Sequence, residues 1–211
     1  MLVSKVAVLS DRVSVVGVAV SVLGLLGGIG VLGQAYWQQS VWFTLLAVGG
    51  PASAVLLIGW NAAAADHKTR VRQRVKVGLV AGLGGLIIYD LVRWSVVWVT
   101  GVAINPFEAL PVFGELLVGA GTSETTRWVA GFGYHIFNGL GFAVFFSIFW
   151  GRKGVLAGVA WAFLLETATL LVYPGWLDIR AKGEFTIVSM VGHASYGVTI
   201  GYICKRFQAN T

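Results

Sequence analysis

The sequence predicts an all-α polytopic membrane protein, folded as a single transmembrane domain over residues 1–211. Of its 211 residues, 57% are hydrophobic and 11% are charged, and the mean hydropathy is +0.80. A soluble domain carries about 25% charged residues, so this composition could not cover a water-exposed surface. The apolar segments run continuously instead of alternating with polar residues, which argues against a β-barrel. One cysteine excludes an internal disulfide framework and a thiolate metal cage.

Six runs of the chain are long and apolar enough to cross a bilayer, since about 20 helical residues cross a core of about 30 Å. The first run is too long for the core of a signal peptide, so we expect it to remain as a membrane anchor. The predicted spans are residues 13–33, 41–65, 77–100, 128–150, 154–173 and 185–203.

The basic residues predict the orientation. Most of the 15 Lys and Arg residues lie before the first span, after the last one, or in the connections 66–76 and 151–153, which are all on one side. The opposite side holds only Arg127, Arg180 and Lys182. By the positive-inside rule both termini are cytoplasmic, and the predicted location is a prokaryotic plasma (inner) membrane. The net charge of +6 follows from this pattern, so we do not expect a nucleic-acid partner.

The connection between the third and fourth spans contains an apolar segment, residues 106–119, that is too short to cross. Pro106 and Pro111 prevent one regular helix through it. Two structures are open: a re-entrant half-helix covered by protein or a wet cavity, and an interfacial helix on the outer surface.

The last four spans contain an internal similarity. Residues 78–90 and 154–166 align without gaps, and an acid ends each segment, Asp90 in the first and Glu166 in the second. The helices that follow contain His135-x-x-x-Gly139 and His193-x-x-x-Gly197. This pattern predicts a tandem hairpin repeat, spans 3–4 and 5–6, with a pseudo-twofold axis along the membrane normal. The alternative is chance similarity between glycine-rich membrane helices.

Polar residues inside the spans are the candidate site. An unpaired charge in the bilayer costs at least about 2.5 kcal/mol, so these side chains should face inward and meet one another. They come from four helices at similar predicted depth in the outer half of the bilayer. We expect one pocket opening near residues 106–119, in which Arg93 neutralises a carboxylate. The pathway set is Asp90, Arg93, His135, Asn138, Glu166 and His193.

Three functions are open for this set, and no catalytic residue can be assigned. The first, which the sequence favours, is a proton-linked small-solute or ion transporter or channel, because histidine titrates near neutral pH. The second is a membrane enzyme or redox subunit with a divalent metal or haem as cofactor. The third is a structural role in an accessory subunit, whose partners are the lipid bilayer, a second copy, or other membrane subunits. The metal ligands would be Asp90, His135, Glu166 and His193.

Overall fold

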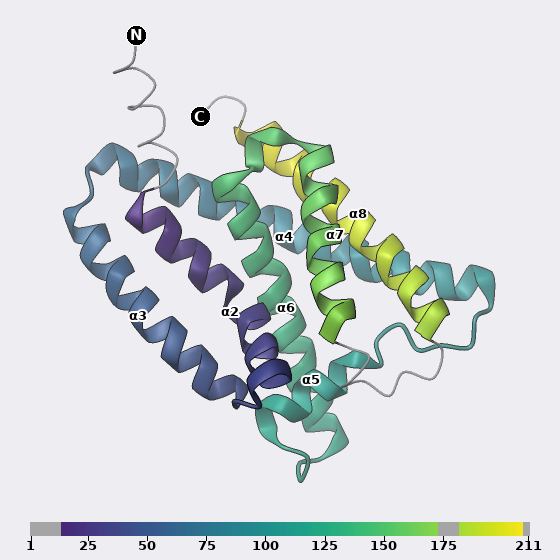
Figure 1. Ribbon diagram of the computed structural model, residues 1–211. Coiled ribbons are helices and arrows are strands. Elements are labelled where there is room, and N and C mark those ends of the chain that lie inside the picture. Colours follow the sequence, from purple (N-terminus) through teal and green to yellow (C-terminus); the bar gives the residue numbers. More distant parts are fainter. Residues whose placement is uncertain (1–13, 173–181, 209–211) are drawn as a thin grey trace.

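The computed structural model describes residues 14–172 and 182–208, and in these two ranges all regular structure is helical (Figure 1). A short 3-10 turn, η1 (Gly151–Lys153), separates α6 from α7. The helices are α2 (Val15–Trp37), α3 (Val41–Ala62), α4 (Ala65–Thr100), α5 (Ala109–Val118), α6 (Glu124–Phe149), α7 (Val155–Val172) and α8 (Lys182–Gln208).

Helix length and composition indicate a membrane protein. In the described part of the chain, α2, α3, α4, α6 and α8 are each long and apolar enough to cross a bilayer. The predicted span 154–173 corresponds to α7, which is apolar but shorter. The helical membrane class is therefore supported by five long candidate spans, and the count of six stays a prediction.

Serine caps set the starts of three helices. The hydroxyls of Ser14, Ser40 and Ser123 accept hydrogen bonds from backbone amides three residues later, at 3.0, 3.0 and 3.1 Å. Each bond satisfies one of the four amides that have no partner inside the first turn of a helix. At the other end of α2, Gln38 adopts a left-handed conformation (φ 53°), which turns the chain directly into α3.

The start of α4 corrects the sequence prediction. The third span was expected to begin at residue 77, after a basic loop, but α4 begins at Ala65 and includes the whole basic segment 68–76. Lys, Arg and Gln are good helix formers, and the Asp66–Arg70 ion pair (2.7 Å) adds support four residues apart. With 36 residues, α4 is roughly 54 Å long at 1.5 Å per residue, well beyond the membrane core.

Contacts between distant segments define the two ends of the bundle. At one end, the Ser147 hydroxyl of α6 donates to the Arg74 carbonyl of α4 (2.6 Å), and the Gln208 amide of α8 donates to the Ser147 carbonyl (3.1 Å). At the other end, the Trp42 indole of α3 donates to the Leu117 carbonyl of α5 (2.7 Å). The described basic residues of the predicted cytoplasmic side lie at or beyond the end of the bundle that contains Ser147. They are Lys68, Arg70, Arg72, Arg74, Lys76, Arg152, Lys153, Lys205 and Arg206.

Glycines allow two helix pairs to approach closely in the same register. A Cβ on Gly82 of α4 would lie 3.2 Å from the Gly139 carbonyl oxygen of α6. A Cβ on Gly158 of α7 would contact the Gly197 carbonyl oxygen of α8. In both pairs, the first glycine is eight residues before the acid and the second is four residues after the histidine. These contacts support the predicted hairpin repeat, whose superposition stays a prediction.

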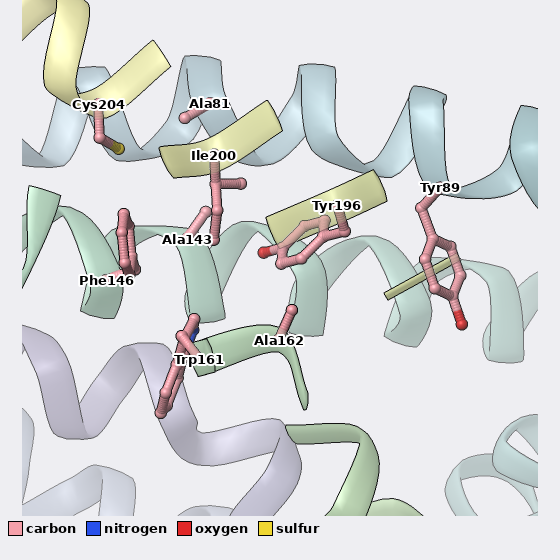
Figure 2. Close-up of a cluster of buried hydrophobic side chains, with 9 residues drawn as sticks. All are labelled: Ala81, Tyr89, Ala143, Phe146, Trp161, Ala162, Tyr196, Ile200 and Cys204. Carbon is pink, nitrogen blue, oxygen red and sulfur yellow. The ribbon is translucent and has the colours of Figure 1, made fainter. Parts of the chain in front are cut away.

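The hydrophobic core joins four of these helices (Figure 2). Its side chains form an elongated cluster, with Cys204 near one end and Tyr89 at the other. Because Tyr89 belongs both to this cluster and to the polar site below, the core fixes the position of that site. The cluster contains Ala81, Tyr89, Ala143, Phe146, Trp161, Ala162, Tyr196, Ile200 and Cys204.

Candidate functional site

Asp90 of α4 pairs with His135 of α6. The His135 Nε2 atom lies 3.2 Å from Asp90 Oδ1 and 3.3 Å from Oδ2, so one ring N–H faces both carboxylate oxygens. The Asp90 side chain is 24% exposed and the His135 side chain 17%. A carboxylate only accepts hydrogen bonds, so the hydrogen of the neutral ring is on Nε2 and the Nδ1 atom carries a lone pair.

Glu166 of α7 pairs with His193 of α8, and this pair is more deeply buried. Glu166 Oε2 lies 3.0 Å from His193 Nδ1, and the Glu166 side chain is 2% exposed. The same Nδ1 atom is 3.0 Å from the Ser189 carbonyl oxygen, and this aligned acceptor places the ring hydrogen on Nδ1. No donor among the described residues is aligned with either Glu166 oxygen, which makes this contact an electrostatic pair rather than a directed hydrogen bond.

Tyr89 connects the two pairs. Its ring centroid lies 5.7 Å from that of His135 and 5.0 Å from that of His193, in a tilted and an edge-on arrangement respectively. Tyr89 is 8% exposed and also belongs to the hydrophobic core. Tyr89 was not among the residues predicted from the sequence, because an aromatic side chain inside a span is common and carries no charge. Its position next to Asp90 was the only available signal.

In the described part of the chain, Arg93 does not neutralise a carboxylate, contrary to the sequence prediction. It is 4% exposed, and no carboxylate among the described residues forms an ion pair with it. Its guanidinium instead lies over the rings of Tyr89 (5.0 Å), Phe107 (5.7 Å) and Phe185 (5.7 Å). Cation–π contacts of this kind stabilise a desolvated guanidinium by about 2 kcal/mol. Gly192 of α8 leaves the space that the Arg93 side-chain stem fills.

A cavity of about 260 Å³ lies beside both pairs. His135, His193, Tyr89 and Asn138 line it, whereas Asp90, Glu166 and Arg93 do not. The predicted convergence is therefore partial, because the imidazoles face the cavity and the carboxylates lie behind them. The remaining lining residues are Leu25, Gly28, Ile29, Val31, Leu32, Leu86, Phe113, Gly139, Phe142, Leu165, Ala168, Thr169 and Tyr196.

The four expected metal ligands do not form one coordination site. They lie in two pairs, and in residues 14–172 and 182–208 no group of three His, Cys, Asp or Glu side chains could hold a metal ion. The geometry therefore does not support the predicted divalent metal site. Bis-histidine haem ligation would require an open slot between the two imidazoles, and the Tyr89 ring contacts both of them.

Comparison with known proteins adds no functional assignment. No protein family, curated protein or solved structure matches this chain. Conclusions about function therefore depend on the helices, the two acid–histidine pairs and the cavity.

Proposed function

We propose that this protein is a proton-linked transporter or channel for a small solute in a prokaryotic plasma (inner) membrane, with both termini in the cytoplasm. The supporting observation is that two acid–histidine pairs border one cavity inside an apolar helix bundle. Phe113 of α5 lines the cavity, so access from outside would lie near this helix.

Each pair is suited to accept and release one proton at its cavity side. The carboxylate lies against the imidazole and stabilises the imidazolium that forms when the second ring nitrogen is protonated. A proton taken from the solute or from water would bind Nδ1 of His135 or Nε2 of His193, and leave from the same atom. Tyr89 contacts both rings, so a change in one pair is transmitted to the packing of the other.

The test is solute-driven proton movement in proteoliposomes that contain a trapped pH-sensitive dye. A panel of small uncharged and weakly acidic solutes is added outside, and the internal pH is recorded. We expect at least one solute to change the internal pH with the wild type, and the effect to disappear with Glu166→Gln and with His135→Gln. The matched control is Gly133→Ala, at a position with no atom within 4 Å of the added methyl group.

If the wild type moves no more protons than empty liposomes with every solute, the transport proposal is wrong. The site would then be polar packing that holds the helices together, as in an accessory subunit. Folding of each variant is checked by its elution as one species in detergent.

A further inference from the structure

The size of the cavity limits what it can hold. Engineered apolar cavities of about 150 Å³ bind benzene. At about 260 Å³, this cavity has room for one ring with a short chain and is too small for a long lipid. Its walls are mainly aliphatic and aromatic side chains, with polar atoms from a few residues. These features favour a compact, mostly apolar ligand.

Among the described residues, the helices on one side of the cavity approach each other less closely than elsewhere. α2 packs closely against α3 and α6, and α7 against α8, whereas α2 and α7 have no extensive close approach of their backbones. α6 stands between them in Figure 1. Leu25 and Ile29 of α2 and Leu165 of α7 all line the cavity and are only half-buried. An entrance between α2 and α7 would therefore be bordered by apolar side chains at the level of the membrane spans.

Two imidazole nitrogens are hydrogen-bond acceptors available in the cavity, which the Asn138 amide and the Tyr89 side chain also line. The hydroxyls of Thr169 and Tyr196 already donate to the carbonyls of Leu165 (2.8 Å) and Gly139 (2.6 Å). Nδ1 of His135 and Nε2 of His193 have no partner among the described residues and are not enclosed, since neither is among the buried unpaired atoms. In the neutral rings both atoms carry lone pairs.

We propose that the cavity binds an uncharged molecule of one-ring size that carries a hydroxyl group and enters from the bilayer between α2 and α7. The hydroxyl donates a hydrogen bond to an imidazole nitrogen that carries a lone pair, because the other ring nitrogen faces an acceptor, Asp90 at His135 and the Ser189 carbonyl at His193. The apolar ring and chain lie against α2 and α7. This inference rests on the proposed function, because such a molecule would be the class of transported solute.

The experiment compares two probes of nearly equal shape, 4-butylphenol and 4-butylanisole. The anisole replaces the hydroxyl by a methoxy group and cannot donate a hydrogen bond. Binding to the full chain in lipid nanodiscs is measured by titration calorimetry, and the heat measured with empty nanodiscs is subtracted. We expect the phenol to bind about three- to tenfold more tightly than the anisole, the ratio that one net hydrogen bond provides.

Two variants separate the polar contact from the space. His135→Phe keeps a ring and removes the acceptor, so the preference for the phenol should fall while anisole binding is retained. Ala168→Phe fills the cavity, so both probes should lose affinity. The ¹⁵N NMR spectrum of the wild type gives a test that does not depend on the folding of any variant. The phenol should shift the ¹⁵N resonance of an imidazole nitrogen, and the anisole should not.

The outcomes distinguish this inference from the proposed function. If the phenol binds as described but no solute moves protons, the binding site stands and the transport proposal fails. If polar solutes move protons while the phenol binds no better than the anisole, transport stands and the ligand class is wrong. Equal binding of the two probes, or no binding above empty nanodiscs, overturns the inference.

Discussion

The glycine contact between α7 and α8 gives a prediction whose magnitude follows from the structure. In Gly158→Ala, the added methyl group would contact the Gly197 carbonyl oxygen and lie 3.0 Å from Gly201 Cα and N. These are backbone atoms, so a side-chain rotation cannot make room and the helices must move apart. Overpacking of this kind costs about 1–3 kcal/mol.

A second substitution isolates this cost. Alanine is favoured over glycine inside a helix by about 0.5–1 kcal/mol, which would mask part of the effect. Gly133→Ala, inside α6, gains the same helix propensity and meets no atom within 4 Å. The difference between the two variants is therefore the overpacking cost, about 1–3 kcal/mol in the free energy of unfolding.

The assay is reversible unfolding in mixed micelles with increasing denaturing detergent, followed by circular dichroism. Gly158→Ala should unfold at a lower detergent fraction than the wild type, and Gly133→Ala at an equal or higher one. If Gly158→Ala is as stable as Gly133→Ala, the close approach of α7 and α8 is not as described, and the shared register of the two hairpins loses its support.

Three further predictions concern the acid–histidine pairs, the hydroxyl of Tyr196 and the topology. His193→Ala leaves the Glu166 carboxylate buried without its partner and should cost about 3–5 kcal/mol. The cost should exceed that of His135→Ala, because the Asp90 side chain is 24% exposed and the Glu166 side chain only 2%; adding Glu166→Gln should restore part of the loss. Tyr196→Phe removes a buried hydrogen bond to Gly139 and should lower stability by about 1 kcal/mol in the same detergent titration. After replacement of Cys204, single cysteines introduced at Gln38, Thr122 and Lys182 should be labelled from outside, and those at Thr69 and Lys153 should not. Labelling at position 69 from outside would contradict the predicted orientation.

The sequence predicted that the acids and histidines of the spans would meet, but not how they would pair. The hairpin pattern put one acid and one histidine in each hairpin and expected all four in one pocket, whereas the structure pairs Asp90 with His135 and Glu166 with His193. The reason is physical, because a charge inside a span must find a partner and the return helix of the same hairpin is the nearest source.

The position of Arg93 could not be read from the sequence. Its spacing of three residues from Asp90 allows an ion pair on one helix face. The alternative, a guanidinium enclosed by three aromatic rings, depends on residues from α4, α8 and the chain before α5, together with the space at Gly192. Tertiary packing of this kind leaves no periodic signal.

The extent of α4 was missed for a different reason. A search for apolar runs stops at the first charged residues, so the basic segment 68–76 was assigned to a connection. Helix propensity does not depend on hydrophobicity, and Lys, Arg and Gln continue a helix into water as readily as Leu does. The boundary at Ala65 follows from Ala63 and Ala64, which have extended backbone conformations.

The central claim is that two acid–histidine pairs hold their imidazoles in opposite tautomers beside one cavity. Solid-state ¹⁵N NMR of histidine-labelled protein in lipid tests it directly, because the two neutral tautomers give different nitrogen shifts. The geometry predicts the Nε2–H form for His135 and the Nδ1–H form for His193, with Asp90→Asn changing the signals of His135 and leaving the tautomer of His193 unaltered. The same tautomer at both histidines, or His135 signals that do not respond to Asp90→Asn, would contradict the account.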